Sequence, residues 1–439
     1  MHLENIAFLT LFITATVMFV MKIREIRANI NMGHDLDRSD NKSERWKTMA
    51  LVAIGQKKMI TRPLAGLLHI VVYAGFIIIN IEMLEIFTDG IFGTHRAFSG
   101  LGGFYNFLIA SFEVLAFLVL VACVVFLLRR NVAKVKRFHY REMTSFPKSD
   151  ANLILISEVL MMSAFLIMNA CDLILQGRGV DHFHTAGAFP ISTFLAPMLD
   201  GIGDGGLILI ERACWWFHIF GVFALLNYLP YSKHFHIVLA FPNVFFSNLR
   251  PKGQFNNLEA VTKEVKLMFD PNADPYAAPV DGGGEVKRFG AKDVTDLTWK
   301  QLLDAYTCTE CGRCSSSCPA NQTGKLLSPR KIMMDTRDRM EEIGRNRKKN
   351  GKDFTDNKSL LGDYITAEEV WACTSCNACV QECPVNIDPL SIIIDLRRYL
   401  VMEESKAPTE LTGMFTNIEN NGAPWQFSPA DRLNWANEA

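Results

Sequence analysis

Eight of the eleven cysteines in this 439-residue chain fall in two runs with the same spacing. The first run reads CTECGRCSSSCPA from Cys308, and the second reads CTSCNACVQECPV from Cys373. Each run is C-x2-C-x2-C-x3-C-P, a spacing in which three thiolates cap one face of an iron–sulfur cubane and the fourth reaches a second cubane. The sequence therefore predicts two [4Fe-4S] clusters whose ligands are exchanged between the runs.

On this crossed pattern, each cluster takes three cysteines from one run and the last cysteine of the other. One predicted set is Cys308, Cys311, Cys314 and Cys383, and the other is Cys373, Cys376, Cys379 and Cys318. Zinc is the alternative metal, but zinc ligands come in pairs, which explains neither the third closely spaced cysteine nor the proline. The other three cysteines, Cys123, Cys171 and Cys214, lie in apolar stretches, where a cysteine usually packs as a small hydrophobic residue.

Histidines in an apolar stretch form a second candidate site. The stretch CWWFHIFGVFALLNYLPYSKHFH holds His218, His234 and His236. His218 and His236 are 18 residues apart, so a straight helix would place them on one face about 27 Å apart, whereas His234 would point roughly 160° away. Ionisable groups at bilayer depth are costly and usually functional. Interfacial histidines, or buried ones with satisfied hydrogen bonds, are the alternative.

A partner for these rings lies in an earlier apolar stretch, RPLAGLLHIVVYAGFIIINIEMLEIF, which contains His69 about two turns after Arg62. His69 and His236 are expected at a similar depth, where two neutral imidazoles on facing helices can ligate a b-type haem. Gly66 and Gly221 would let the flat macrocycle approach the backbone closely. The alternative is that His69 only forms a hydrogen bond to a neighbouring span.

An outer haem at His218 would need a second ligand from the same earlier stretch. Asn80 and Met83 lie about three turns beyond His69 on its face. Methionine can ligate haem and asparagine usually does not, so an outer haem with an unusual ligand and no outer haem both remain open. Three carboxylates within the spans could serve protons or a quinone, or be paired structural groups: Glu82, Glu113 and Glu158.

Five membrane spans are predicted to position these groups, because each is near the roughly 20 residues that cross a bilayer as a helix. They are residues 5–21, 63–87, 104–128, 151–175 and 207–231. The intervening loops differ strongly in charge. Residues 22–62 hold ten Lys or Arg and residues 129–148 hold seven, but residues 88–103 and 176–206 hold one each. The positive-inside rule then predicts a multi-pass inner-membrane protein with its N-terminus outside and its iron–sulfur half in the cytoplasm.

The predicted fold is all-α, with a five-helix transmembrane cytochrome b-like bundle followed by a cytoplasmic α-helical ferredoxin domain that holds both clusters. The proposed division is a membrane domain at 1–245, a linker at 246–297, the cluster domain at 298–404 and a partner-contacting tail at 405–439. The cytoplasmic placement argues against disulfides. The formal net charge of −1 gives no electrostatic reason to expect nucleic acid as a partner.

Two parts of the chain resemble known families. The stretch TWKQLLDAYTCTECGRCSSSCPANQTGKLLSP, with the second cysteine run, resembles the ferredoxin part of heterodisulfide-reductase-type iron–sulfur proteins. The segment 62–245 resembles the haem-binding gamma subunit of respiratory nitrate reductase, and LPYSKHFHIVLAFP closes the fifth span as in that family. This resemblance implies His236 as the inner haem ligand and His218 as the outer one. That family has two histidines ten apart in the second span, where this chain has His69 and Ile79.

Together these features predict a membrane-anchored electron-transfer subunit of a heterodisulfide-reductase-like respiratory complex. It would relay electrons between a cytoplasmic partner, two [4Fe-4S] clusters, haem b and the quinone pool. The expected partners are membrane lipid, quinone, a cysteine-rich heterodisulfide-reductase-like subunit and a flavoprotein. No Gly-rich nucleotide loop or nucleophile–base pair is evident, which favours a non-catalytic or quinone-reacting subunit. A self-sufficient quinone oxidoreductase, or a structural anchor with stabilising clusters, are the alternatives.

Overall fold

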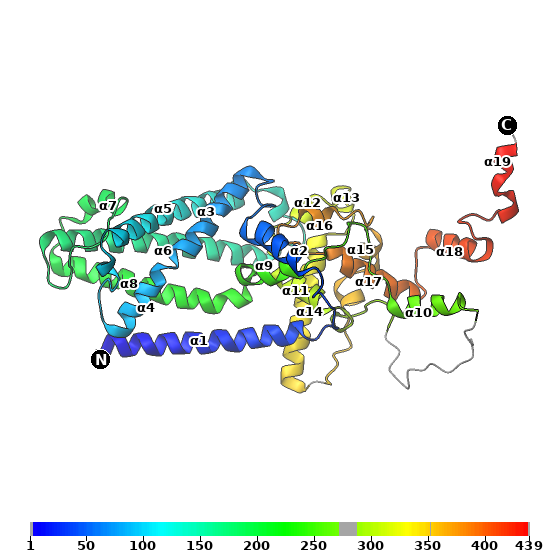
Figure 1. The fold of residues 1–439 in the computed structure, drawn as a ribbon, viewed down its shortest axis with the longest axis horizontal. Helices are drawn as coiled ribbons and strands as arrows, with labels where there is room; N and C mark the ends of the chain where they lie inside the picture. The colour runs from blue at the N-terminus through cyan, green and yellow to red at the C-terminus, as the bar shows by residue number, and fades with distance from the viewer. Residues whose placement is uncertain (1–2, 272–287, 352, 438–439) are drawn as a thin grey trace.

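The structure is a computed structural model that describes residues 3–271, 288–351 and 353–437. Long helices form one end of the elongated molecule, and a group of shorter helices forms the other (Figure 1). Within the described residues the only strand-like pairings are two isolated bridges, His34 with Thr298 and Leu361 with Ile365. The predicted all-α class is confirmed.

Five stretches of helix are long and apolar enough to cross a membrane, as the sequence predicted. They are α1 (Leu3–Ile30), α3 with α4 (Pro63–Ile79 and Glu82–Phe92), α5 (Gly103–Asn131), α6 (Ser145–Arg178) and α8 (Asp204–Tyr228). Helix α6 packs between α5 and α8, while α3 packs on α5 and α1 packs along α4 and α8. Exposed side chains on this bundle include Val17, Phe76, Phe107 and Phe220, an apolar surface that suits contact with lipid.

The second span is broken into two helices. Helix α3 starts with Pro63 at its first turn and ends at Ile79, and α4 starts at Glu82. At the break, the Asn80 side chain donates a hydrogen bond back to the Phe76 carbonyl, which competes with continued helix formation. The two halves therefore pack differently, α3 against α5 and α4 against α1.

The fifth span does not continue as one helix to His236, so the expectation of a single straight stripe is wrong. Helix α8 ends at Tyr228, because Pro230 follows and cannot continue the hydrogen-bond ladder. Two short 3-10 turns follow, at Leu229–Tyr231 and Lys233–Phe235. A separate helix, α9, then runs over His236–Phe245, so His218 and His236 lie on different helices.

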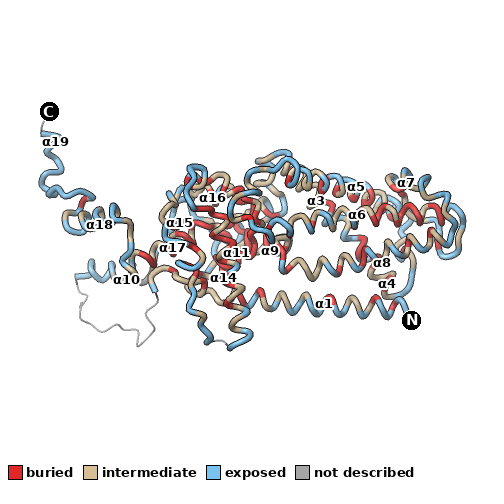
Figure 2. The backbone as a smooth tube through the Cα atoms, turned by 180° about the vertical axis from the view of Figure 1, so that it is seen from behind, coloured by how far each residue is buried: buried red, intermediate tan, exposed pale blue. Residues whose placement is uncertain are grey.

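The cysteine-bearing end is built on α11 (Trp299–Thr307), α14 (Pro329–Asn350) and α17 (Pro389–Met402). Short helices carry the cysteine runs and their surroundings: α12 (Arg313–Ser316), α13 (Pro319–Gln322), α15 (Ala367–Trp371) and α16 (Ala378–Glu382). Its core also contains Ile26, Ala53, Leu239 and Val244 from the membrane half, because α9 packs on α11. Figure 2 shows buried residues concentrated around α9, α11 and α14. The two halves are therefore docked together.

The expected linker is only partly separate from the cluster domain. Its first part includes α10 (Glu259–Met268), and its Pro- and Gly-rich centre at 272–287 lies outside the described residues. Ala291, Val294 and Leu297 are fully buried in the core around the cysteine runs. The packed domain therefore begins before residue 298.

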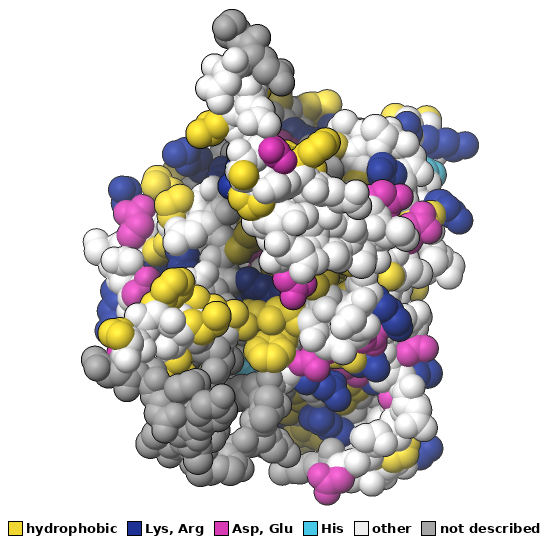
Figure 3. All heavy atoms as spheres, turned by 90° about the vertical axis from the view of Figure 1, so that its right-hand side faces the viewer, with side chains coloured by type: hydrophobic (Ala, Val, Ile, Leu, Met, Phe, Trp, Pro, Cys, Tyr) yellow, Lys and Arg dark blue, Asp and Glu magenta, His cyan; other side chains and the backbone are white. Residues whose placement is uncertain are grey.

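The C-terminal segment extends away from the rest of the chain (Figure 1). It contains α18 (Thr409–Asn421) and α19 (Asn434–Asn437), and no residue of either helix is buried. Its exposed side chains include Phe415, Ile418, Trp425 and Trp435. Figure 3, which views the molecule from this end, shows hydrophobic side chains scattered among charged ones. Helix α2 (Lys42–Met49) and α7 (Ser192–Leu199) are the two remaining α-helices of the described residues.

Candidate functional site

The two cysteine runs share one local backbone. Glu310 and Gly312 in the first run have φ of 53° and 70°, and the matching Ser375 and Asn377 have φ of 55° and 60°. These left-handed residues turn each loop so that backbone N–H groups face sulfur. In the second run, the Ser375 N–H donates to Cys373 Sγ at 3.4 Å. The repeated turns thus place the thiols of each run on the inner side of a loop.

The thiols of the two runs lie close together, and the predicted crossed sets are called here the first group, with Cys314 and Cys383, and the second group, with Cys379 and Cys318. Burial, followed by the nearby Cys311, Cys308, Cys383 and Cys379 thiols, raises the pKa of Cys314 well above its usual range. Burial likewise raises the pKa of Cys379, whose thiol neighbours are Cys373 and Cys318. No three His, Cys, Asp or Glu side chains in the described ranges are close enough to hold one metal ion. A four-iron cluster does not require that, because its cysteines bind separate iron atoms.

Three positive side chains lie near the first group, and two of them, Lys58 and Arg62, come from the membrane half. Lys58 Nζ donates to the Cys383 carbonyl at 3.2 Å, and Arg313 Nη1 donates to the Lys58 carbonyl at 2.9 Å. Arg62 forms a 3.2 Å ion pair with Glu382, the residue before Cys383. Cations at this position favour thiolates, which are the form that ligates iron. The surroundings therefore fit an anionic cluster.

The second group lies closer to solvent. Cys376 is exposed, whereas Cys379 is buried. Arg397 holds this loop, because Nε donates to the Val370 carbonyl at 3.0 Å and Nη2 donates to the Cys373 carbonyl. Its guanidinium also lies 5.2 Å from the Trp371 ring centre. A redox partner would reach this group more easily than the first.

The structure brings His69 and His236 together. Their ring centres are 6.5 Å apart with a 40° angle between the ring planes. Imidazoles that ligate one metal from opposite sides have centres about 6.4 Å apart, given metal–nitrogen bonds of about 2.0 Å and the half-width of each ring. His236 Nδ1 lies 3.0 Å from the Lys233 carbonyl, which leaves Nε2 as the ligating atom, while His69 Nδ1 is buried without a partner. This pair fits the axial ligands of a haem.

His234 lies beside this pair rather than on an opposite face, so that expectation is wrong. Its ring centre is 5.5 Å from that of His236, with the rings nearly perpendicular. Burial, with smaller effects from His236 and His69, lowers the pKa of His234 to about 3. The cause is the break after α8, which removes the continuous helix on which the angular argument depended.

Neither glycine singled out in the sequence faces the His69–His236 pair. A Cβ on Gly66 would lie 2.5 Å from the Met59 carbonyl oxygen, and one on Gly221 would lie 3.3 Å from Met161 Sδ. Gly66 is therefore needed for the close approach of the preceding loop to α3. The expected role of Gly66 and Gly221 in approaching a macrocycle is corrected accordingly.

The outer position around His218 lacks an evident second ligand among the predicted residues. His218 is buried near Phe165, with ring centres 6.3 Å apart, and its Nδ1 has no hydrogen-bond partner. Ile79 packs in the apolar core of α5 and α6. The Asn80 amide is committed to the Phe76 carbonyl, and Met83 is buried in a cluster with Phe8 and Ile219.

The three carboxylates within the spans have different surroundings. Glu113 is structural, since it accepts hydrogen bonds from the Ile191 and Ser192 N–H groups at 2.9 and 3.1 Å and from Asn169 at 3.1 Å. Glu158 is partly buried on α6. Glu82 is buried, and its Oε2 has no hydrogen-bond partner.

Sequence reasoning missed the residues that join the two centres. Lys233 Nζ donates to Glu310 Oε2 at 2.7 Å, and Arg337 donates to Glu310 Oε1 at 2.8 Å. Glu310 lies between Cys308 and Cys311 and is buried, and these two cations lower its pKa despite burial. The sequence feature that could have indicated these partners is Glu310 itself, an acidic residue inside a cysteine run that would bind an anionic cluster. Such a residue requires cationic partners.

Comparison with known proteins supports the cysteine-bearing half. Residues 304–387 match the 4Fe-4S dicluster domain family. A probable iron-sulfur-binding oxidoreductase of Bacillus subtilis, FadF, is 31% identical over 99% of this chain and 61% of its own length. An EtfAB:quinone oxidoreductase of Syntrophomonas wolfei is 26% identical over 92% of this chain and 55% of its own length. This chain thus spans less than two thirds of either relative.

A third relative matches a smaller part of the chain. It is one of the subunits of a ferredoxin/F(420)H(2)-dependent CoB-CoM heterodisulfide reductase from Methanosarcina acetivorans, 34% identical over 27% of this chain and 60% of its own length. No solved structure matches the chain. The predicted resemblance to heterodisulfide-reductase-type iron–sulfur proteins is confirmed, and the chain is a membrane protein with a [4Fe-4S] dicluster domain.

Proposed function

We propose that this chain is a membrane-anchored electron-transfer subunit of a heterodisulfide-reductase-like respiratory complex. It would relay electrons between a cytoplasmic partner, two [4Fe-4S] clusters, haem b and the quinone pool. The observation that supports this most is the junction between the halves. There Lys233 contacts both Glu310 of the first cysteine run and, through its carbonyl, His236.

The residues that would hold each group follow from the arrangement of side chains. One cluster would be held by Cys308, Cys311, Cys314 and Cys383, the other by Cys373, Cys376, Cys379 and Cys318, and the haem by His69 and His236. When bound, these groups supply one-electron redox chemistry. The cationic side chains around the first cysteine group would stabilise its negative charge, and the buried junction would exclude water from the space between the centres.

The loop charges support an inner-membrane location in which the iron–sulfur half is cytoplasmic and the N-terminus lies outside. The exposed Cys376 and the extended segment 405–437 would then meet soluble partners. A cysteine-rich heterodisulfide-reductase-like subunit is the partner that the third relative favours. A flavoprotein is a further candidate.

A second candidate function is favoured by one relative's name, EtfAB:quinone oxidoreductase. In this alternative the chain belongs to a self-sufficient enzyme that passes electrons from EtfAB to quinone. Purified chain alone should then oxidise EtfAB with quinone as acceptor, whereas a subunit should need a further cysteine-rich partner. A purely structural anchor would show no electron transfer between its clusters and quinone in either case.

The proposed relay can be tested on the full-length protein in membranes. Dithionite-reduced membranes should show a b-type difference spectrum and cluster EPR signals, and menadione should oxidise both. His236→Ala should lose the haem spectrum and slow oxidation of the clusters about tenfold or more, while His139→Ala, an exposed loop histidine, serves as the control. Clusters oxidised by menadione at the same rate in His236→Ala and in the unaltered protein would contradict the relay.

A further inference from the structure

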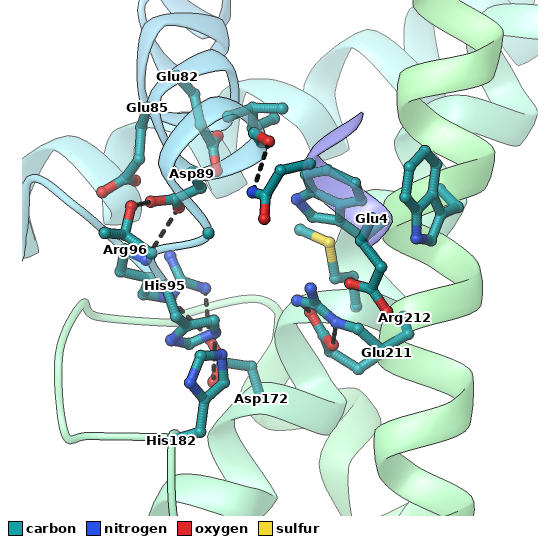
Figure 4. A pocket seen from close by; sticks show the side chains of 18 of the residues that line it. Glu4, Glu82, Glu85, Asp89, His95, Arg96, Asp172, His182, Glu211 and Arg212 are labelled. Carbon is teal, nitrogen blue, oxygen red and sulfur yellow. Dashed lines mark hydrogen bonds and ion pairs between the residues drawn. The ribbon is translucent and has the colours of Figure 1, made fainter. Parts of the chain in front are cut away.

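A polar cavity of about 590 Å³ lies at the end of the bundle remote from the cysteine runs. It is formed by the start of α1, by α4 and the loop after it, and by facing parts of α6 and α8 (Figure 4). One wall is apolar and aromatic, with Ile86, Met168, Trp215 and Trp216. Trp215 and Trp216 are perpendicular neighbours with ring centres 5.1 Å apart.

Most charged groups in this cavity already have partners. The Arg96 guanidinium forms an ion pair with Asp172 at 2.6 Å, and Arg212 donates to Glu211 at 2.7 Å. Glu85 accepts a hydrogen bond from Tyr105 at 2.9 Å. The two guanidinium groups are therefore paired with carboxylates within the protein, and Glu85 is held by a hydrogen bond. The excess of carboxylates also disfavours an anionic ligand such as a phosphate.

Two polar groups lining the cavity lack such partners. Glu82 is 6% exposed, and its Oε2 atom has no hydrogen-bond partner. The Nδ1 atom of His95 is likewise buried without a partner, and its Nε2 lies 3.9 Å from Asp172. Burial lowers the pKa of His95 to about 4, so this ring is neutral at pH 7. A buried polar atom without a partner calls for an explanation, and a bound ligand supplies one.

The chemistry of the cavity favours one class of ligand. A flat ring can pack against the tryptophans, and oxygen atoms on it can exchange hydrogen bonds with a carboxyl and an imidazole. Exposed Leu3, Leu84 and Phe92 are apolar residues of the helices that border this end, so a lipid-soluble molecule can approach from the bilayer. Quinones combine all three properties.

We infer that this cavity binds the headgroup of a membrane quinone or quinol, with Glu82 and His95 contacting its oxygen atoms. The inference rests on the proposed function, because that function includes a membrane quinone. The apolar tail would leave between the helices into lipid. Trp215 and Trp216 would form the surface on which the ring packs.

Menadione binding to the purified full-length protein, followed by quenching of tryptophan fluorescence, tests this site. Glu82→Gln and His95→Asn should each raise the Kd about tenfold or more, while Glu158→Gln, a carboxyl on α6 outside the cavity, should not change it. Iron content reports whether each variant is folded. A photoreactive azidonaphthoquinone should also label residues 82–96 or 207–216 of the unaltered protein, a measurement that needs no variant.

Failure of this assignment is distinguishable from failure of the proposed function. Tight menadione binding that neither variant weakens, or labelling confined to other segments, would overturn the cavity as the site and leave the relay intact. An unaltered protein that neither binds nor is oxidised by menadione would overturn the relay to quinone itself.

Discussion

Lys233 Nζ lies 2.7 Å from Glu310 Oε2, and this ion pair joins the His236 loop to the first cysteine run. Both side chains are largely buried, with 11% and 3% of their surfaces exposed. The Lys233 carbonyl accepts the His236 Nδ1 hydrogen bond, so one residue positions a haem-ligand candidate and contacts the cluster loop. Replacing one member of such a buried ion pair with an uncharged residue is destabilising, because the other charge stays buried without its counter-ion.

Replacing Lys233 with Met should therefore loosen the junction between the two centres. Glu310 keeps Arg337 as a partner. The free energy of unfolding should therefore fall by about 2 kcal/mol, which is within the range for one hydrogen bond to a charged group. Both cofactor signals should remain, but cluster-to-haem electron transfer should slow, as stopped-flow absorbance of dithionite-reduced protein mixed with menadione would measure. Lys47→Met removes an exposed pair with Glu44 and is the matched control. Equal electron-transfer rates in Lys233→Met and Lys47→Met would show that the Lys233–Glu310 ion pair has no role in electron transfer.

The crossed ligation predicts that neighbouring cysteines of one run serve different clusters. Cys314→Ser should damage the cluster held with Cys383, whereas Cys318→Ser should damage the one held with Cys373. The reason is the shared spacing of the two runs, and the proximity of Cys314 to Cys383 and of Cys318 to Cys379 agrees with it, while Cys379 also lies near Cys314. EPR of the reduced variants, with iron quantitation, should show two different residual clusters. Loss of the same signal in both variants would refute the crossing.

The histidine pair predicts one haem per chain with His69 and His236 as its axial ligands. Alanine at either position should remove the haem, because it leaves a single imidazole of the pair to hold the group. His234→Ala should retain it, since the 6.5 Å pair is unchanged. His218→Ala should also retain it, because Ile79 and Asn80 offer no opposing ligand. Pyridine haemochrome ratios measure this, and a ratio that falls by half in His218→Ala would reveal a second haem.

The five spans and the cysteine runs were predictable because their signals are local. A span is a run of apolar residues, and a cluster motif is a spacing of cysteines, so neither depends on distant parts of the chain. The meeting of His69 and His236 was also predictable from depth along the spans. The angular relation of His218, His234 and His236 could not be predicted. The helix ends just before Pro230, and two 3-10 turns and a separate helix follow it.

The junction between the halves could not be read from the sequence, because it depends on contacts between residues far apart in the chain. Lys233 and Glu310 are 77 residues apart, and Arg62 and Glu382 are 320 apart. The start of the cluster domain was misplaced for the same reason. Ala291 and Leu297 are buried only because α11, α14 and α17 close over them.

Arg339 holds three segments of the cluster domain together, which gives a test of its stability. Its side chain is 3% exposed and pairs with Asp293 at 2.7 Å and Asp356 at 2.7 Å, and it donates to the Lys358 carbonyl at 2.7 Å. Arg339→Met would leave two partly buried carboxylates without their cation. The free energy of unfolding of the cluster domain should therefore fall by about 3 kcal/mol.

The Tm of the purified protein, followed by loss of iron–sulfur absorbance, should therefore fall by about 6–12 °C in Arg339→Met. Arg345→Met removes only an exposed pair with Glu341, and its Tm should stay within about 2 °C of the unaltered protein. The network joins the segment around Asp293 to α14, so limited proteolysis of Arg339→Met should also cleave first near residue 293. Unchanged Tm and unchanged cleavage in Arg339→Met would show that α11, α14 and α17 hold the domain together without this network.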